Sequence, residues 1–328
     1  MTTYKGIKGF TIQNLSADPS NPIEGEMWYN STSNVWKVEE ATAAGAWATG
    51  GNMPTSYSEN AGGGSKIAGI QFGGNGTGET NEYNGTWTSV NAMINARNNC
   101  GGSGSQTAAL AVGSQDISPP PAAYSNLVEE YDGTSWTACT NYPTVIASNP
   151  GLTGVITAAI MAGGSDNSSQ LSVVNNYDGT TWTAETVLPS ARDRNGVCGT
   201  QTTAISLGGR DPSAPPYLNT VDTYDGTSWT NVTNYPTGLI GIGTSGDSAN
   251  AVTFGGNNYP GTKQTATNIW NGSTFSSDTA MSTARNQGSH GNFGSSTSGT
   301  FAAGGSGSTA TEEWTGPGAP LTQTITVS

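Results

Sequence analysis

The sequence predicts an all-β protein in which one short unit is repeated six times. Aromatic residues recur about every 47 residues, and each one opens a turn signal that ends at a second aromatic residue. Between these turns, a short apolar run ends in a pair of glycines. Glycine makes up 47 of the 328 residues, and no segment shows the sustained periodicity of a helix.

The turn at each leading aromatic residue predicts a hairpin. Asn-Gly or Asp-Gly stands between the two aromatic residues, and glycine accepts the positive φ that such turns require. The leading residues are Tyr83, Tyr131, Tyr177, Tyr224, Trp270 and, in a degenerate copy, Trp314. Each hairpin is expected to place its second aromatic residue on the outer strand of the unit.

The glycine pairs predict a second, buried strand in every unit. They are Gly73-Gly74, Gly163-Gly164, Gly208-Gly209, Gly255-Gly256 and Gly304-Gly305, with Val112-Gly113-Ser114 in the second copy. The apolar run before each pair is too short for a helix. The segment before that run is rich in Gly, Ala and Ser, which suits a strand close to a central axis. Four short strands in each of six units predict a six-bladed β-propeller.

The repeat also predicts the domain boundaries. The units begin near Trp47, Trp87, Trp136, Trp182, Trp229 and Phe275. We expect an N-terminal arm over residues 1–46, followed by a propeller over residues 47–328 that includes a C-terminal strand. The strand at Trp47 is the favoured partner to complete the last blade, because it would cover an exposed edge. The alternating segment 321–327 is the other candidate, or it adds to the arm or to a neighbouring subunit.

Composition excludes several classes of function. The chain has 10 Lys and Arg against 23 Asp and Glu, and a net charge of −13 disfavours binding to nucleic acid or to an anionic membrane. No apolar run approaches the roughly 18 residues of a membrane-spanning helix. A single histidine and three cysteines supply neither a histidine-based metal site nor a disulfide framework, so we expect no metal and no cofactor.

Three arginines at one position of alternate units are candidate binding residues. Ala-Arg occurs at Arg97, Arg192 and Arg285, whereas the other three units carry Pro-Thr there, which predicts a two-blade unit repeated three times. In a structural interpretation, each arginine ties adjacent blades through backbone carbonyls. In a functional interpretation, the three arginines form a cationic ring that binds an anion or an acidic glycan at one mouth of the channel.

Three tyrosines in the most variable loops are further candidates. Tyr124, Tyr217 and Tyr259 lie in the Pro- or Gly-containing segments 115–126, 211–219 and 257–267. Insertions on one face of a repeat protein commonly form its contact surface. These rings could stack on sugars, or they could simply hold the loops in place.

Two segments resemble known families. The fourth unit combines Leu188-Pro189-Ser190-Ala191-Arg192, the pair Gly208-Gly209, Tyr224-Asp225 and Trp229, and so resembles the kelch repeat. It departs from that repeat in lacking a His after the Arg and in a shorter loop before the Trp. The predicted hairpin of residues 25–38, with Trp28, Tyr29 and Trp36, is similar to a segment near the start of phage tail-fibre proteins. Together they resemble kelch-like virion proteins of tailed bacteriophages, including phages of marine cyanobacteria.

This resemblance implies a non-enzymatic protein of the virion surface, either a tail-fibre or tail-tip component or a head-decoration protein. Residues 1–46, with Trp28, Tyr29 and Trp36, would anchor it to other virion proteins, and the propeller would bind host-surface polysaccharide. A trimer is a candidate assembly. The alternative is a glycan-degrading enzyme, a depolymerase or a sialidase-like protein, on the same scaffold. The turn at Asp225 resembles the sialidase Asp-box, but its spacing to Trp229 is one residue short. An intracellular adaptor is the third hypothesis, and it predicts a partner domain.

Overall fold

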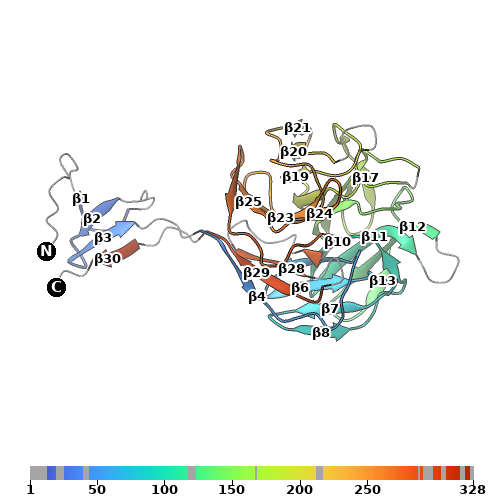
Figure 1. Ribbon diagram of the computed structural model, residues 1–328, viewed down its shortest axis with the longest axis horizontal. Helices are drawn as coiled ribbons and strands as arrows, with labels where there is room; N and C mark the ends of the chain where they lie inside the picture. The colour runs from blue at the N-terminus through green and yellow to red at the C-terminus, as the bar shows by residue number, and fades with distance from the viewer. Residues whose placement is uncertain are drawn as a thin grey trace. The chain divides into compact units, whose positions relative to one another are not determined.

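The computed structural model describes residues 13–19, 26–39, 44–116, 123–166, 168–211, 217–286, 289–290, 298–303, 308–317 and 322–325. None of these residues is helical, so the predicted all-β class is confirmed (Figure 1). The chain divides into two compact units. The smaller unit joins Met1–Gly45 to Pro317–Ser328, and the larger unit is Ala46–Gly316.

The described part of the larger unit contains six sheets, each with a path of four antiparallel strands. The first sheet is β5 (Ala61–Ser65), β6 (Ala68–Phe72), β7 (Thr80–Tyr83) and β8 (Trp87–Val90). The second is β10 (Gly101–Ser105), β11 (Ala108–Asp116), β12 (Ala123–Tyr131) and β13 (Trp136–Ala138), with β9 (Arg97–Asn98) paired to β11. The third is β14 (Gly151–Val155), β15 (Ala158–Ala162), β16 (Val174–Tyr177) and β17 (Trp182–Ala184).

The remaining three sheets follow the same pattern. The fourth is β18 (Gly196–Gly199), β19 (Ala204–Leu207), β20 (Val221–Tyr224) and β21 (Trp229–Asn231). The fifth is β22 (Leu239–Gly246), β23 (Ala251–Asn258), β25 (Thr267–Trp270) and β26 (Phe275–Asp278), with β24 (Thr262–Lys263) on β23. The sixth is β27 (Ser289–His290), β28 (Ser298–Ala303), β29 (Thr311–Thr315) and β4 (Ala46–Thr49).

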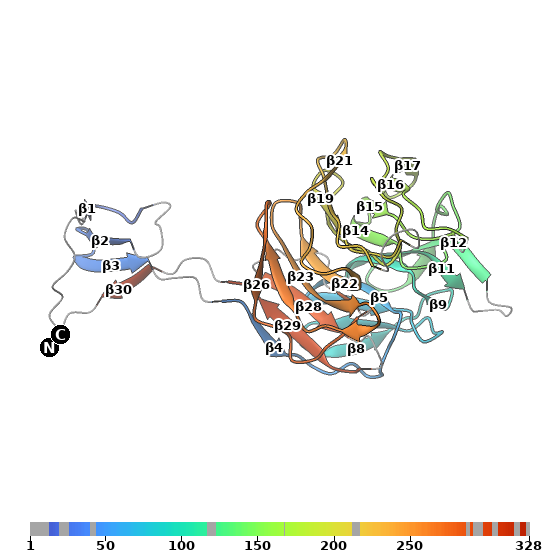
Figure 2. The ribbon, with the colours of Figure 1, turned by 45° about the horizontal axis from the view of Figure 1, so that its top comes forward.

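The arrangement of these sheets is propeller-like (Figures 1 and 2). The first strand of each sheet contacts the first strand of the next, and β27 of the sixth sheet contacts β5 of the first. Glycines allow this close approach, because a Cβ on Gly63 of β5 would lie 2.7 Å from the carbonyl oxygen of Gly104 in β10. The predicted Gly/Ala/Ser-rich strands are therefore the inner strands.

The aromatic pairs set the register of the outer hairpins, as the sequence predicts. The directly paired residues are Tyr83 and Trp87, Tyr131 and Trp136, Tyr177 and Trp182, Tyr224 and Trp229, and Trp270 and Phe275. In the turn after Tyr224, Asp225 accepts hydrogen bonds from two backbone N–H groups, and Gly226 has a φ of 91°. The predicted pair Gly304-Gly305 lies outside the described residues.

The sixth sheet is completed by a strand from the start of the unit. Trp47 of β4 pairs with Trp314 of β29, and Ala46 pairs with Thr315. This is the favoured one of the predicted alternatives. The indole N–H of Trp47 also donates to the Thr267 hydroxyl of the fifth sheet at 2.8 Å.

The smaller unit is a separate four-stranded sheet. Its order is β1 (Gln13–Leu15), β2 (Met27–Asn30), β3 (Val35–Glu39) and β30 (Thr322–Ile325), and β1 is parallel to β2. The predicted division needs correction here, because the C-terminal strand belongs to this sheet and the propeller-like unit ends at Gly316. Glu39 pairs with Thr322, so β30 covers the edge of β3 while β4 occupies the edge of the sixth sheet.

One carboxylate organises the smaller sheet. Asp18 accepts hydrogen bonds from the Trp28 indole at 3.0 Å and the Asn30 amide at 2.7 Å, and it pairs with Lys37 at 2.5 Å. The hydrogen bond from Lys37 is the main reason that the pKa of Asp18 falls to about 2. Trp28 is fully buried, so of the three predicted anchoring residues only the contacting rings of Tyr29 and Trp36 are partly exposed.

Candidate ligand-binding site

The three predicted arginines are buried and neutralised. Arg97 and Arg192 are fully buried and Arg285 is 1% exposed. Each guanidinium group pairs with a carboxylate of its own sheet: Arg97 with Glu129, Arg192 with Asp222 at 2.7 Å, and Arg285 with Glu312 at 2.7 Å. The functional interpretation of a cationic ring is therefore corrected, because these arginines present no charge to a ligand.

The structural interpretation needs a refinement. The guanidinium groups bond to carbonyls of their own sheet, for example that of Arg285 to the Ala310 oxygen at 2.9 Å. The link to the preceding sheet is made by the arginine's own carbonyl, which accepts from the second glycine of each pair. These bonds run from Gly74 to Arg97 (2.8 Å), from Gly164 to Arg192 (2.8 Å) and from Gly256 to Arg285 (2.9 Å). The glycine pairs and the arginines thus belong to one junction.

The alternation of the units has a physical basis in the third strand of each sheet. The arginine-paired carboxylates Glu129, Asp222 and Glu312 stand two residues before the leading aromatic residue. In the other three sheets, this place is taken by Asn81, Asn175 and Asn268, whose amides donate to the hydroxyls of Tyr57, Tyr142 and Tyr235 at 3.2, 2.6 and 2.7 Å. Arginine–carboxylate and tyrosine–asparagine pairs therefore alternate around the unit.

Burial and hydrogen bonding shift the ionisation of these pairs. Burial lowers the pKa of Arg192 and of Arg285. Burial alone would raise the pKa of Glu312, but hydrogen bonds from the Ser282 N–H and from Arg285 outweigh it, so this pKa lies below its ordinary value. The lowered pKa of Glu312 keeps its carboxylate ionised opposite Arg285 near neutral pH.

A ring of residues stands at one end of the inner strands, and we call it the mouth ring. Its members are Glu59, Asn99, Asn149, Arg194 and Gly241, from the first to the fifth sheet. Backbone bonds connect neighbours: Asn99 N–H to the Glu59 oxygen (2.8 Å), Arg194 N–H to the Asn149 oxygen (3.0 Å), and Gly241 N–H to the Arg194 oxygen (2.9 Å). The Asn149 amide donates to the Asn99 side chain at 3.0 Å.

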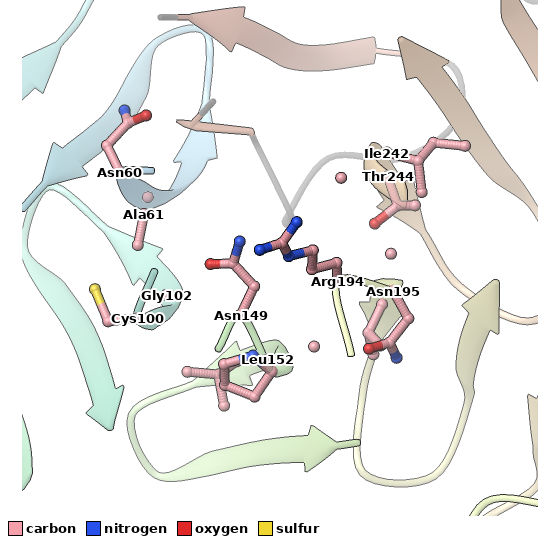
Figure 3. Close-up of a pocket in the computed structure, with 16 residues that line it drawn as sticks. Asn60, Ala61, Cys100, Gly102, Asn149, Leu152, Arg194, Asn195, Ile242 and Thr244 are labelled. Carbon is pink, nitrogen blue, oxygen red and sulfur yellow. The ribbon is translucent and has the colours of Figure 1, made fainter. Parts of the chain in front are cut away.

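Two cavities meet at Arg194 of this ring. The central cavity, of about 90 Å³, is lined by the starts of inner strands from five sheets, and the side chains of Asn149 and Arg194 reach into it (Figure 3). The side cavity, of about 260 Å³, is lined by Asn99, Tyr124, Ala147, Ser148, Ser165, Ser168, Ser169, Gln170, Arg194 and Arg210. Hydroxyl, amide and guanidinium groups dominate its surface.

The predicted loop tyrosines separate into two places. Tyr124 lines the side cavity and is 40% exposed. Tyr217 and Tyr259 contact one another edge to face, with ring centroids 6.0 Å apart, and are not among the residues that line either cavity. Only Tyr124 is thus brought to the candidate site.

Arg194 was not among the candidates that the sequence suggested. It stands two residues after Arg192, where the second sheet has Asn99 two residues after Arg97. The signal that could have identified it is this break in the repeat, an arginine in place of a small polar residue.

Among the described residues, no three His, Cys, Asp or Glu side chains are grouped so as to hold a metal ion. Over the same part of the chain, there is no helix with the length and apolar character needed to span a membrane.

Comparisons with known proteins bear on the fold. No family model and no curated protein matches the sequence. The structure is similar to the solved structure of YjhT, with a TM-score of 0.67 and 13% sequence identity. The match covers 84% of this chain and 99% of that one. At this identity the likeness supports a shared propeller-like fold.

Proposed function

We propose that the chain is a non-enzymatic surface protein of a bacteriophage particle, a tail-fibre, tail-tip or head-decoration component. A closed, six-bladed, kelch-like propeller binds host-surface glycan through the side cavity. The smaller sheet anchors the propeller to other virion proteins. The resemblance of the sequence to kelch-like virion proteins motivates the location.

Contacts between the first and sixth sheets support a closed ring of six blades. The Tyr83 hydroxyl of the first sheet donates to Glu313 of the sixth at 2.5 Å, and the Trp87 indole donates to the Thr311 hydroxyl at 2.9 Å. The same contacts join interior neighbours, since Tyr131 donates to Glu82 at 2.9 Å. The junction between the first and last sheets is therefore built like the others.

The lining of the side cavity is the observation that carries the binding function. Tyr124 offers an aromatic face, and the serines, Gln170 and the two arginines offer hydrogen-bonding groups around it. A sugar ring presents an apolar face and a rim of hydroxyls, which such a lining complements. Guanidinium, amide and hydroxyl groups hold a ligand but are poorly suited to exchange protons with it near neutral pH.

The path of the chain supports the anchoring role. The larger unit is inserted between β3 and β30 of the smaller sheet, so strands that precede and follow the larger unit in sequence belong to that sheet. An anchor made from both segments holds the inserted unit by two covalent connections. Tyr29 and Trp36 give it a partly exposed aromatic contact.

Cryo-electron microscopy of purified particles tests the location. Six-bladed discs on the tail or on the head lattice are expected, and absence of the chain from the particle would overturn the virion role. Adsorption tests the binding: purified protein should block attachment of phage to host cells. Release of reducing ends from host envelope polysaccharide would instead support the glycan-degrading alternative.

A further inference from the structure

Arg194 differs from every other arginine in the described part of the chain. Arg97, Arg192, Arg210 and Arg285 each pair with a carboxylate, whereas Arg194 is in no ion pair. Its Nε is buried and has no hydrogen-bond partner; the same is true of the Nε of Arg97, but the guanidinium group of Arg97 is held by Glu129. Withdrawing a guanidinium N–H from water without a partner is unfavourable, so another interaction must offset the cost.

The backbone gives no reason for an arginine at this place. Arg194 has a φ of 56°, and three other members of the mouth ring, Glu59, Asn99 and Gly241, have φ values of 58°, 56° and 58°. Asparagine and glycine adopt this left-handed region readily, whereas a long side chain is disfavoured there. The explanation therefore has to come from the side chain.

The side chain is held at the junction of the two cavities. Its backbone is bonded on one side to Asn149 and on the other to Gly241, which fixes the base of the side chain. Figure 3 shows it directed into the hollow between the inner strands. Nearby, the Ser148 hydroxyl is also buried without a hydrogen-bond partner, and it lines the same side cavity.

The charged side chains that line the side cavity favour an anion. Its described lining contains Arg194 and Arg210, and it contains no carboxylate. Arg210 pairs with Asp193 behind it at 2.7 Å, so the unopposed positive charge comes from Arg194. Two carboxylates lie close by without lining the side cavity: Glu59 of the mouth ring, on the first sheet, and Asp166, which accepts hydrogen bonds from Ser168 and Ser169.

We propose that Arg194 and Ser148 bind the carboxylate of an acidic sugar residue, such as a uronic acid, in the side cavity. A planar guanidinium donates two parallel hydrogen bonds to a carboxylate, and the Ser148 hydroxyl supplies a further donor. Tyr124 covers the sugar ring. About 260 Å³ is just below the range for drug-sized ligands, so the cavity holds a single sugar residue. This inference rests on the proposed glycan-binding function and assigns its ligand class.

The test is calorimetric titration of the full chain with glucuronic acid, galacturonic acid, glucose and glucose 6-phosphate. Arg194→Asn is the informative variant, because Asn99 shows that asparagine fits this backbone. Lys263→Gln is the matched control, since it removes one positive charge from exposed β24. Thermal unfolding verifies that both variants fold.

We expect uronic acids to bind the wild-type protein and glucose to bind at least tenfold more weakly, given the strength of hydrogen bonds to charged groups. Arg194→Asn should weaken uronate binding by about tenfold or more and leave the melting temperature unchanged, and Lys263→Gln should bind as the wild type does. Equal uronate binding by wild type and Arg194→Asn overturns the proposal. Preference for glucose 6-phosphate overturns the carboxylate assignment.

The adsorption assay separates this inference from the proposed function. If wild-type protein and Arg194→Asn block phage adsorption equally well, the attachment role stands and the role of Arg194 is refuted. If neither blocks adsorption and the chain is absent from particles, the proposed function itself is refuted.

Discussion

At the scale of single residues, one buried arginine–carboxylate ion pair lies in each of the second, fourth and sixth sheets. The pair of Arg192 and Asp222 is completely buried. Replacing one member alone leaves a buried charge without a partner, which is far more costly than removing both. Such an ion pair therefore adds little net stability, but it requires that both charged side chains be present at the two positions.

Arg192→Met should lower the free energy of unfolding by about 3–5 kcal/mol, because Asp222 then stays buried and unpaired. The double variant Arg192→Met/Asp222→Leu should regain most of this loss. Urea unfolding of the wild type, both single variants and the double variant measures the coupling. Additive losses in the double variant would contradict this account.

A second residue-scale feature is an unsatisfied tryptophan. The indoles of Trp136, Trp87 and Trp47 donate to Thr80, Thr311 and Thr267 of the preceding sheet at 2.8–2.9 Å. Trp229 packs against the third sheet, where the equivalent residue is Val174, and its indole nitrogen is buried without a partner.

Val174→Thr should supply the missing acceptor and raise the free energy of unfolding by about 0.5–1.5 kcal/mol. Val128→Thr is the control, because Trp182 above it already donates to the Thr140 carbonyl at 3.2 Å. Thermal unfolding of both variants measures the change in stability. An equal or greater increase in stability in Val128→Thr would refute the explanation that the hydroxyl introduced by Val174→Thr supplies the missing acceptor for Trp229.

At the scale of elements, the outer hairpins show how far local sequence determines structure. The pattern of an aromatic residue, an Asx-Gly turn and a second aromatic residue predicted the outer hairpins of the first five sheets correctly, because all the determinants lie within six residues. At the degenerate copy, Trp314 pairs with β4 and forms no local hairpin with the described residues that follow it. The two-residue strands β9 and β24 were not predicted, since such short pairings depend on neighbouring segments. The partner of each buried arginine was also missed, because it lies about 30 residues away on another strand.

The turn aspartates predict acid sensitivity. Hydrogen bonds from two backbone N–H groups lower the pKa of Asp132, Asp178 and Asp225. The folded state therefore binds these protons less readily than the unfolded state does. The three aspartates therefore contribute to the stability of the folded state in full above the pKa that they have in the unfolded chain. This contribution is lost as the pH falls through their lower pKa in the folded state.

The urea concentration at the unfolding midpoint of the wild type should therefore decrease as the pH is lowered from about 5 to about 3. A variant with Asp132, Asp178 and Asp225 all changed to Asn should show a smaller fall. Asn271 already accepts the same two backbone bonds in its own turn, so these substitutions keep the geometry. Identical pH profiles would show that other groups cause the acid sensitivity.

At the scale of the whole molecule, the larger unit depends on a strand from its own beginning. The sequence favoured closure by the strand at Trp47, because the last unit is the only one that can precede this strand in the ring, and the strand would cover an exposed edge there. The place of β30 could not be settled in the same way, since its alternating pattern fits any open edge. Arg194 was missed for a similar reason, because five sheets have to meet before the mouth ring exists.

Two truncations test the closure. Residues 46–316 alone should fold, because they retain β4. Residues 50–316 lack this strand and leave the sixth sheet with an open edge, so their melting temperature should be markedly lower. Circular dichroism melts of the two fragments make the comparison, and equal stability would show that β4 is dispensable.

The insertion of the propeller-like unit between β3 and β30 has a mechanical consequence. The two connecting segments, residues 40–45 and 316–321, have equal lengths. They join the paired residues Glu39 and Thr322 of the smaller sheet to the paired residues Ala46 and Thr315 of the sixth sheet. Tension applied through the smaller sheet therefore enters the propeller-like unit at two paired residues, Ala46 of β4 and Thr315 of β29. Because β4 and β29 are antiparallel and both connections lie at the same end of the pair, such a load pulls the two strands in the same direction.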